Sequence, residues 1–482
     1  MTDQRTRTAT ASGPVTGGRG WAFGSPADAG EYGYVIEEFL LDGVAQSYEP
    51  VPGAVIGRDG KWAVQPGERA GYRTRVYVAR PADPARFNGV AIVNWLNVTA
   101  GFDLGAPSAH EMRAGYAWAG VTTQAVAVNG QPALAPGFPS TPGLPRIDPG
   151  RYGTLHHPGD QFSYDIFTQA ARALRGDRQE AGAAGTAGTA GTAGADLLGG
   201  LTPRLVLASG ASQSAARLGA YINMADDQER CFDGYFLVTH WGLCVYPPDQ
   251  PLMVTFGPLG DGFHGGSSAI DDRGRVPILV VNSESETLHN VPVRQPDSPT
   301  FRFWEIAGTA HIGASPDLTP MLEREGMPVF PPAENANTID WAWIADAALE
   351  HLVRWADAGT PPPSFPLIEA SLDAGIHHDE TGNATGGIRV PELAAPTAAH
   401  SGTRPGNPLA ALVGQSIRYT PARIASRYAD ASAYVREWDA AVDRARAQGL
   451  VLDDDLERLR QRGREAAAEI FSVDLPACDV LQ

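Results

Sequence analysis

The feature that most constrains this chain is a short apolar segment that leads through a serine-rich turn into a helical pattern. Residues 205–208 have the character of a buried strand, and Leu218 and Tyr221 recur at helical spacing. Between them lies Gly210-Ala-Ser-Gln-Ser214, in which small residues stand two positions before and two positions after Ser212. This arrangement is typical of a nucleophile elbow, in which a serine is held on a strained turn between a strand and a helix.

Ser212 is therefore the predicted nucleophile. The helix that follows it directs amide groups and a positive dipole end toward negative charge that develops on a carbonyl oxygen. The usual last residue of such an elbow is glycine, and here it is Ser214. Ser214 has small residues two positions away on each side, so it is the alternative nucleophile, although it would lie one turn into the helix. A serine-rich loop without a catalytic role is the competing interpretation, because motifs this short occur often by chance.

Strands and helices are predicted in alternation along most of the chain. The predicted strands cover 33–52, 71–80, 89–98, 120–127, 232–239, 276–281 and 301–306. The predicted helices cover 108–117, 163–175, 338–357, 422–447 and 452–470. The near-continuous apolar run at 89–98 is typical of a parallel strand buried on both faces. The alternation predicts an α/β fold with a mostly parallel central sheet and helices on both faces.

The 482 residues fit one large α/β domain with insertions. Residues 1–20, rich in Thr, Gly and Arg, predict a flexible N-terminal tail. The domain itself is expected over 21–420, followed by a helical extension over 421–482 that packs on the same domain. A Gly-Thr-Ala repeat at about 182–196 predicts a disordered linker. The Gly-, Pro- and Asp-rich segment at about 241–275 predicts a lid-like insertion over the sheet edge.

The composition excludes several classes of partner. The formal net charge of −18 argues against nucleic acid and anionic membranes, which attract basic surfaces. No apolar run is long enough to span a bilayer, and the N-terminal residues lack the apolar stretch of a signal peptide. The three cysteines (Cys231, Cys244 and Cys478) have no metal-site spacing and fit reduced thiols. We therefore expect a cytoplasmic protein that acts on a small molecule, and the sequence leaves its oligomeric state open.

An acid and a histidine follow later strands in the order that a hydrolase of this kind requires. In α/β-hydrolases the triad runs Ser, then Asp or Glu, then His along the chain. Glu284 and Glu286 follow the predicted strand at 276–281. Glu286 is favoured as the acid because of its distance from the strand end, and Glu284 is the alternative. His311 follows the next strand in a loop of small residues, so Ser212, Glu286 and His311 form the predicted triad.

Other polar residues have weaker patterns. The oxyanion hole is expected to use the backbone amide of Gln213 and that of Leu96 or Asn97, although the Asn97 side chain could instead fix its loop. His240, Trp241 and His157 are candidate pocket residues, for which packing or turn roles compete. The acidic and histidine residues at 377–380 are adjacent on a coil, and such residues rarely converge on one ion. No metal site and no cofactor are predicted.

Several of these stretches carry a family resemblance. They are Val93–Thr99, Gly115–Val121, Gly210–Ser214, Ser283–Glu286, Ala307–His311 and Gly382–Arg389. Over roughly residues 30–440 the chain resembles large-insert proteins known as alpha/beta hydrolase domain-containing proteins. The resemblance implies a serine hydrolase with Ser212 as nucleophile and His311 as base. Such families usually place Asp where this chain has Glu286, and the resemblance names no substrate.

The predicted function is hydrolysis of a carboxylic ester, lactone or thioester through an acyl-enzyme. An acyltransferase with the same triad is one alternative, in which an alcohol or amine replaces water. A non-catalytic binding protein on a hydrolase fold is another.

Overall fold

The computed structural model describes residues 7–20, 28–131, 140–176, 194–244, 267–313, 334–405 and 412–471. The chain divides into two compact units, Met1–Ile278 and Leu279–Gln482. Most of the predicted linker at 182–196 and most of the predicted insertion at 241–275 lie outside the described residues, as does Cys478. The predicted domain organisation stays a prediction.

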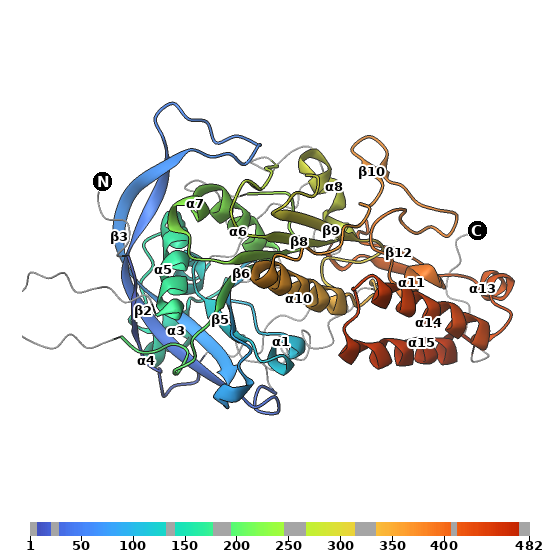
Figure 1. The fold of residues 1–482 in the computed structure, drawn as a ribbon, viewed down its shortest axis with the longest axis horizontal. Helices are drawn as coiled ribbons and strands as arrows, with labels where there is room; N and C mark the ends of the chain where they lie inside the picture. Colours follow the sequence, from blue (N-terminus) through green and yellow to red (C-terminus); the bar gives the residue numbers. More distant parts are fainter. Residues whose placement is uncertain are drawn as a thin grey trace, which may run out of the picture. The chain divides into compact units, whose positions relative to one another are not determined.

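The first unit is built on a sheet whose strands stand in the order β1-β2-β3-β5-β4-β6-β7. Their bounds are Thr10–Ser12, Tyr34–Pro50, Val64–Pro81, Val90–Trp95, Ala117–Val121, Leu205–Ala211 and Gly234–Val238 for β1 to β7. The strands from β1 through β3 to β5 pair antiparallel, and β5, β4, β6 and β7 pair parallel. Figure 1 shows β2 and β3 as two long strands that run side by side. The parallel strands bring the loops after β4, β5 and β6 to one edge of the sheet.

Two long helices pack on this sheet. Helix α5 (Ser163–Arg175) contacts β2 and β4, and α6 (Gln213–Met224) contacts β4, β6 and β7. Residues 90–93 of β4 are all buried, as expected of a strand covered on both faces. The short helices of this unit are η3 (Pro84–Arg86), α1 (Ala109–Arg113), α2 (Ala125–Asn129), α3 (Leu144–Ile147), α4 (Pro149–Tyr152), η4 (Asp160–Phe162) and α7 (Asp226–Glu229). The predicted α/β-hydrolase fold is confirmed.

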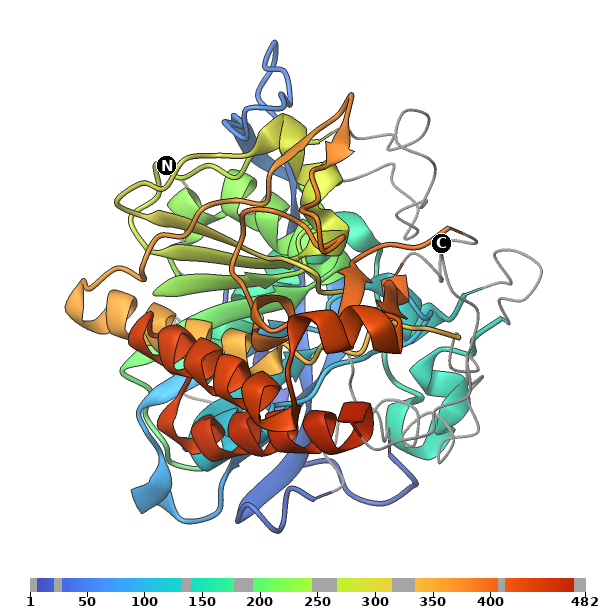
Figure 2. The same ribbon diagram turned by 90° about the vertical axis from the view of Figure 1, so that its right-hand side faces the viewer.

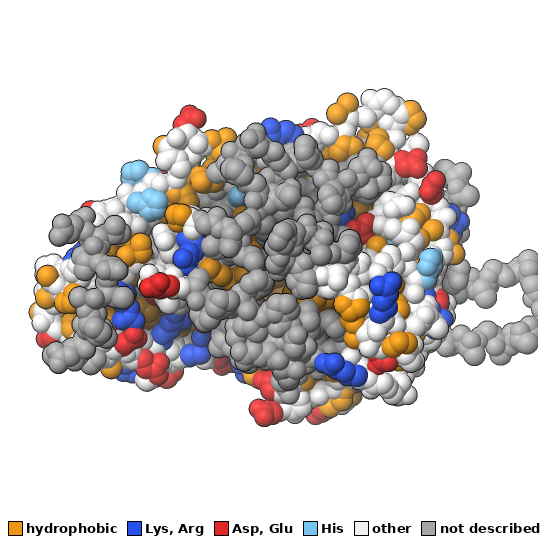
Figure 3. Space-filling model, turned by 180° about the vertical axis from the view of Figure 1, so that it is seen from behind, with side chains coloured by type: hydrophobic (Ala, Val, Ile, Leu, Met, Phe, Trp, Pro, Cys, Tyr) orange, Lys and Arg blue, Asp and Glu red, His pale blue; other side chains and the backbone are white. Residues whose placement is uncertain are grey.

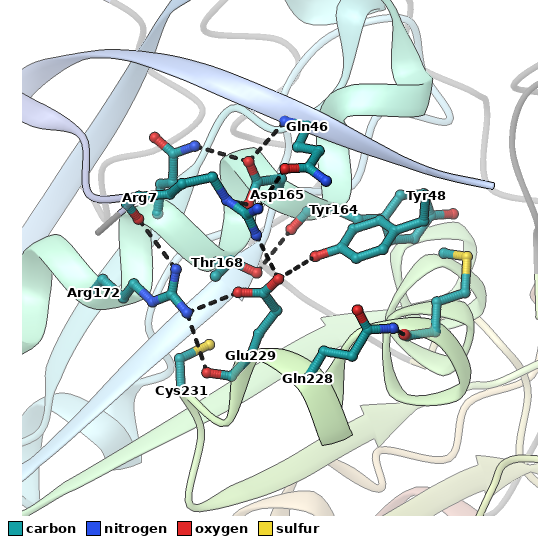
Figure 4. A network of polar contacts seen from close by, with 12 residues as sticks. Arg7, Gln46, Tyr48, Tyr164, Asp165, Thr168, Arg172, Gln228, Glu229 and Cys231 are labelled. Carbon is teal, nitrogen blue, oxygen red and sulfur yellow. Dashed lines mark hydrogen bonds and ion pairs between the residues drawn. The ribbon is translucent and has the colours of Figure 1, made fainter. Parts of the chain in front are cut away.

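Residues 7–20, for which the sequence predicts a flexible tail, include the paired strand β1. Strand β1 pairs with β2 in register, with Thr10 opposite Asp42. Arg7 forms ion pairs with Asp165 at 3.3 Å and with Glu229 at 2.6 Å, as Figure 4 shows. Strand pairing and the neutralisation of two buried carboxylates thus hold this segment on the first unit.

The strand predicted over 120–127 is wrong in its second half. Strand β5 ends at Val121, and α2 begins at Ala125. The alternating Ala and Val residues fit a strand and a short helix equally well. The Asp160 carboxylate decides between them, because it accepts a hydrogen bond from the Ala125 amide at 2.8 Å and fixes the start of the helix.

The second unit contains two neighbouring strands, β8 (Ile278–Ser283) and β9 (Phe301–Ile306), with Ile278 at the division between the units. Two small antiparallel pairs follow, β10 with β11 (Ala370–Ser371, Gly375–Ile376) and β12 with β13 (Ala398–Ser401, Gln415–Arg418). The helices are η5 (Glu284–Glu286), α8 (Thr287–Asn290), η6 (Val291–Val293), α10 (Ala342–Ala358), α11 (Pro391–Ala394), α13 (Pro421–Arg427), α14 (Ala431–Ala447), η7 (Asp453–Asp455) and α15 (Leu456–Phe471). The predicted helical extension thus begins with α13.

The helix predicted over 422–447 is in fact two helices. Tyr428 adopts an extended conformation after α13, and the Asp430 side chain accepts a hydrogen bond from the Ala433 amide at 2.7 Å. An aspartate in this position caps a new helix, so α14 starts there with its own N-terminus. Figures 1 and 2 show α14 and α15 side by side.

The close approach of α14 and α15 depends on Gly463. A Cβ atom at this position would lie 2.4 Å from the Trp438 ring. The indole nitrogen of Trp438 donates a hydrogen bond to the Leu459 carbonyl oxygen at 2.9 Å. A larger residue than glycine would therefore push the two helices apart at a buried tryptophan.

The surface of the described residues carries charges of both signs. On the face shown in Figure 3, Lys and Arg side chains lie interspersed with Asp and Glu side chains. Among the helices that the structure describes, none combines the length and the apolar character needed to cross a membrane.

Candidate active site

Ser212 lies at the junction of β6 and α6 with a strained backbone. Its φ and ψ angles are 60° and −120°. A residue other than glycine in such a region costs about 1–3 kcal/mol, and such strain clusters at active sites. The Ser212 amide donates a hydrogen bond to the Val238 carbonyl oxygen at 2.9 Å, so the neighbouring strand β7 holds the strained residue in place. This is the conformation that the predicted nucleophile elbow requires.

The small residues around Ser212 allow the backbone to fold tightly at the elbow, as the sequence predicts. A Cβ atom on Gly210 would lie 2.9 Å from the Ser214 carbonyl oxygen. The Ser214 hydroxyl donates to the Ala211 carbonyl oxygen at 2.8 Å and accepts from the Ala211 amide at 2.9 Å. Ser214 therefore closes the turn of the elbow, and its hydroxyl is engaged with the backbone that carries Ser212. These contacts favour Ser212 over Ser214 as the nucleophile.

The Asn97 side chain fixes the loop after β4. Its amide nitrogen donates to the Ala211 carbonyl oxygen at 2.9 Å, and its amide oxygen accepts from the Thr99 backbone at 2.9 Å. Of the two roles that the sequence left open for this side chain, the structure shows the loop-fixing one. The contact with Ala211 also ties the loop to the elbow.

The backbone amides that are candidates for the oxyanion hole differ in their hydrogen-bond acceptors. Gln213 is the first residue of α6, and the first four amides of a helix have no partner within the helix. The Leu96 amide donates to the Val121 carbonyl oxygen at 3.4 Å, and the Asn97 amide donates to the Leu104 carbonyl oxygen at 2.9 Å. An oxyanion role for Leu96 or Asn97 stays a prediction, and it requires one of these amides to exchange its present acceptor for the oxyanion.

In the second unit, the structure brings Glu286 and His311 together. The Nδ1 atom of His311 lies 2.6 Å from a carboxylate oxygen of Glu286, and both side chains are buried. The other oxygen of Glu286 accepts hydrogen bonds from the backbone amide and the hydroxyl of Ser283, at 2.9 and 2.7 Å. The carboxylate is thereby fixed in one orientation. A proton on Nδ1 directed at Glu286 leaves Nε2 of His311 as an acceptor.

Glu284, the alternative acid, has a different place. Its two carboxylate oxygens accept hydrogen bonds from the backbone amides of Gly308 at 2.7 Å and Gly402 at 2.9 Å. Burial raises the pKa of Glu284, although these two amide hydrogen bonds act in the opposite direction. Glu284 therefore holds the loop that carries His311, while Glu286 contacts the imidazole itself.

Further residues that support the His311 loop were not predicted from the sequence. The Ser285 hydroxyl accepts a hydrogen bond from the His311 amide at 2.8 Å and donates one to the Gly402 carbonyl oxygen at 2.5 Å. The Asn337 side chain donates to the Gly308 carbonyl oxygen at 2.7 Å, and the Trp341 indole donates to the Ala310 carbonyl oxygen at 3.0 Å. Of these residues, only Ser285 could have been identified from the sequence, because it stands between the two candidate acids. Asn337 and Trp341 lie far from those acids along the chain, so no local pattern indicates their role.

The candidate pocket histidines both stabilise turns. The Nδ1 atoms of His157 and His240 accept hydrogen bonds from the amides of the glycines two residues later, each at 3.2 Å. Their Nε2 atoms bond backbone oxygens of Thr123 and Leu243, each at 2.8 Å. Burial lowers the pKa of His157 and lowers that of His240 to about 4, so both rings are neutral near pH 7. The turn role that the sequence left open for His157 is observed. His240, for which packing was the competing role, is buried and also stabilises a turn.

Trp241 is buried next to the His240 turn, which fits a packing role. The adjacent pair at 377–378 follows β11, and the exposed His377 ring contacts the Thr385 hydroxyl at 2.8 Å. Within the described ranges, no group of three or more His, Cys, Asp or Glu side chains is arranged to hold a metal ion.

The structure therefore divides the predicted site residues between the two units. The first unit carries the elbow with Ser212, Gln213 and the Asn97 loop, and the second unit carries the Glu286–His311 pair. A contact between Ser212 and His311 is part of the mechanism that we propose for this site.

Comparison with known proteins agrees with this fold. A family model described as an alpha/beta hydrolase domain matches residues 11–461. No curated protein matches the chain. A ferulic acid esterase from Streptomyces cinnamoneus is similar at 12% identity, with 61% of this chain and 85% of that chain covered and a TM-score of 0.32.

Two further solved structures are similar at comparable levels. A glucuronoyl esterase from Solibacter usitatus has 16% identity, with 48% of this chain and 55% of that chain covered and a TM-score of 0.19. An oligopeptidase B from Trypanosoma brucei has 11% identity, with 57% and 33% covered and a TM-score of 0.27. These similarities carry no argument about the reaction. The family match spans most of the chain, and the chain belongs to the alpha/beta hydrolase domain family.

Proposed function

We propose that this protein hydrolyses a carboxylic ester, lactone or thioester through an acyl-enzyme formed on Ser212. The observation that carries the proposal is the strained backbone of Ser212 at the β6–α6 junction. A serine held in this way presents its hydroxyl above the sheet edge, at the N-terminus of a helix. Strain of this kind clusters at active sites, so it supports a functional role for Ser212.

In the proposed mechanism, Ser212 Oγ attacks the carbonyl carbon of the substrate. His311 Nε2 takes the hydroxyl proton and later delivers it to the leaving group. Glu286 holds the Nδ1 proton of His311 and stabilises the positive charge that forms on the ring. The Gln213 amide, with one from the Leu96–Asn97 loop, binds the negative oxygen of the tetrahedral intermediate. Water then attacks the acyl-enzyme in the same way and releases the acid.

The Glu286–His311 pair supports the base assignment. A hydrogen bond of 2.6 Å between a buried carboxylate and Nδ1 fixes both the ring orientation and the tautomer that leaves Nε2 ready to accept a proton. The turn-stabilising His157 and His240 lack this arrangement, because both of their ring nitrogens bond to the backbone.

Steady-state hydrolysis tests the proposal. A panel of 4-nitrophenyl esters, thioesters and lactones is assayed with wild type, Ser212→Ala and the matched variant Ser214→Ala. Ser212→Ala is expected to lower kcat by roughly 10⁴- to 10⁶-fold, as removal of a catalytic serine does. Ser214→Ala is expected to retain most of the activity. Full activity of Ser212→Ala would overturn the proposal. If added alcohol speeds up the reaction and a transesterified product forms, the protein is an acyltransferase.

A further inference from the structure

The run Gly382–Arg389, one of the stretches that carry the family resemblance, takes no direct part in the proposed reaction. The structure places it between β11 and α11, and its Asn383 side chain is fully buried. The amide oxygen of Asn383 accepts a hydrogen bond from the His400 backbone at 2.8 Å, and its nitrogen donates to the Ala398 carbonyl oxygen at 3.2 Å. Asn383 therefore holds the backbone of β12 through both groups of its side chain.

The other end of this run is joined to the loop at 307–312, which carries His311 and which we call the His311 loop. The Ile388 amide donates to the Glu305 carbonyl oxygen of β9 at 2.7 Å, and the Ala307 amide donates to the Ile388 carbonyl oxygen at 3.0 Å. Ala307 directly follows β9. The run thus bonds both to β12 and to the start of the His311 loop.

Residues 401–402, at the end of β12, contact the same loop through two side chains, and we call them the β12 turn. The Gly402 amide donates to a carboxylate oxygen of Glu284 at 2.9 Å, and the Gly402 carbonyl oxygen accepts from the Ser285 hydroxyl at 2.5 Å. The other Glu284 oxygen accepts from an amide of the His311 loop at 2.7 Å, and the Ser285 hydroxyl accepts from the His311 amide at 2.8 Å. Each side chain therefore bridges the β12 turn and the His311 loop.

Gly402 leaves no space for a side chain. A Cβ atom at this position would lie 2.5 Å from the Ser285 amide nitrogen and 2.6 Å from the Thr309 carbonyl oxygen. Both are backbone atoms, so they cannot rotate away as the end of a flexible side chain can. Ser285 directly precedes Glu286 in the chain. Thr309 lies two residues before His311, so a side chain at position 402 would press on the backbone that carries each member of the acid–base pair.

The chain before β13 and the Asn337 side chain add further contacts. The amide of Ile312, the residue after His311, donates to the Leu412 carbonyl oxygen at 2.9 Å. The Asn337 side-chain nitrogen donates to a carbonyl oxygen of the His311 loop at 2.7 Å and to that of Ser401 at 3.1 Å. Backbone groups before and after His311 are therefore bonded to the chain that forms β12 and β13, or to side chains that this chain contacts.

We propose that the Gly382–Arg389 run and the β12 turn position the imidazole of His311 for catalysis. Asn383, Gly402 and Ser285 are accordingly positioning residues. The inference rests on the proposed function, in which His311 is the base. The competing explanation is that these contacts stabilise the second unit and have no effect on the contact between the imidazole and its carboxylate. The two explanations differ in what a disrupted turn does to that contact in the folded protein.

The first experiment compares two glycine substitutions in the second unit. Gly402→Ala forces a Cβ atom into the β12 turn, and Gly463→Ala forces one to within 2.4 Å of the Trp438 ring, between α14 and α15. Both variants are expected to lower the urea midpoint. Only Gly402→Ala should lower kcat for an ester that the wild type hydrolyses, by roughly 10- to 100-fold with KM little changed, because a misplaced base slows turnover and leaves substrate binding intact. Equal kcat values for the two folded variants would overturn the proposal.

Two further variants keep the test decisive if Gly402→Ala does not fold. Ser285→Ala removes only the hydroxyl that joins the β12 turn to the His311 loop, and Asn383→Ser shortens the side chain that holds β12. Each should lower kcat by roughly 3- to 10-fold with KM little changed, as the loss of about one hydrogen bond does. A folded Ser285→Ala with the kcat of Gly463→Ala would overturn the role of the β12 turn. A folded Asn383→Ser with that kcat would overturn the role of the run.

Proton NMR makes the test independent of turnover. A proton on the imidazole Nδ1 of His311, in a hydrogen bond of 2.6 Å to a buried carboxylate, resonates far downfield of the amide protons, and its loss in Glu286→Gln assigns it. This resonance is expected in wild type and in Gly463→Ala, and it should move upfield or disappear in folded Gly402→Ala. A resonance that stays in place in Gly402→Ala, or a wild type without one, would overturn the proposal.

The two readouts separate this inference from the proposed reaction. If no ester, thioester or lactone is hydrolysed while the resonance responds to Gly402→Ala, the positioning of His311 is supported and the proposed reaction fails alone. If the wild type hydrolyses an ester through Ser212 while kcat and the resonance are the same in Gly402→Ala and Gly463→Ala, the positioning proposal fails alone.

Discussion

Two buried polar regions of the first unit differ in composition, because the first is held by ion pairs between charged side chains and the second contains neutral side chains. Around Glu229, the carboxylate accepts from Arg7 at 2.6 Å, Arg172 at 2.7 Å and Tyr48 at 2.9 Å (Figure 4). At the sheet edge, Thr123 and Gln213 each keep a buried atom without a protein partner among the described residues. We refer to these regions as the Glu229 network and the edge cluster.

We infer from this difference that the Glu229 network stabilises the fold and that the edge cluster serves the reaction. The Glu229 network joins the N-terminal segment, β2, α5 and α7, and its charges are matched within the protein. Gln213 of the edge cluster follows the strained Ser212 in the chain, and strained positions of this kind cluster at active sites. Variants in the network should therefore lose stability and keep activity, and variants in the site should do the reverse.

The largest expected effect is on the catalytic side. Glu286→Gln should lower kcat by roughly 10⁴-fold, because the amide favours the wrong tautomer of His311 and cannot stabilise its charged form. The free energy of unfolding should change far less than the activity. Steady-state kinetics and urea unfolding on the same preparation check both quantities. Glu284→Gln is the matched control, and it should lower kcat less than Glu286→Gln does. Equal losses of kcat would contradict the distinct roles of the two acids.

The next effect tests the Glu229 network. Arg7→Met should lower the free energy of unfolding by about 3–5 kcal/mol, because it leaves the carboxylates of Asp165 and Glu229 buried with one cation fewer. The kcat of the folded fraction should remain near that of wild type. Urea unfolding measures the first quantity and active-site titration the second. A variant as stable as wild type would show that the ion pairs of Arg7 contribute nothing to the stability of the fold.

Stability should depend on pH below neutrality. Burial lowers the pKa of His240 and of His400 to about 4, whereas an unfolded histidine has a pKa near 6.5. Below pH 6.5 the unfolded state therefore binds protons that the folded state does not. The stability is fully present above pH 6.5 and falls as the pH decreases toward 4, by about 3 kcal/mol for each histidine.

Urea unfolding between pH 7 and pH 4 measures this fall. His400→Gln removes one of these buried histidines and should reduce the fall by about 3 kcal/mol. The activity of the folded fraction is followed separately. A free energy of unfolding that stays constant between pH 6.5 and pH 4 would contradict neutral buried histidines.

The smallest expected effect lies outside both regions. Asp430→Ala removes the side chain that caps α14 and should lower the free energy of unfolding by about 1 kcal/mol. Activity should not change. Asp430→Asn, which preserves a capping oxygen, should recover most of the loss, and a variant without any such recovery would argue against the capping role.

The sequence predicted those features whose causes are local. The elbow follows from small residues at fixed distances from Ser212, and Glu286 and His311 follow from the order of strands along the chain. The choice between Glu284 and Glu286 depends on side-chain directions after one strand, so it needed the structure. Strand β1 pairs with a distant segment, and the edge cluster includes Thr123, which had been assigned to a longer strand. Such features depend on tertiary contacts that local patterns do not contain.

The most direct test of the central claim is mass spectrometry after treatment with a fluorophosphonate. Wild type, Ser212→Ala and Ser214→Ala are treated alike, and the modified residue is identified by peptide mapping. A single adduct on Ser212, absent from Ser212→Ala and retained in Ser214→Ala, is the predicted result. An adduct on Ser214, or none in wild type, would contradict an activated Ser212 and favour a binding protein built on this fold.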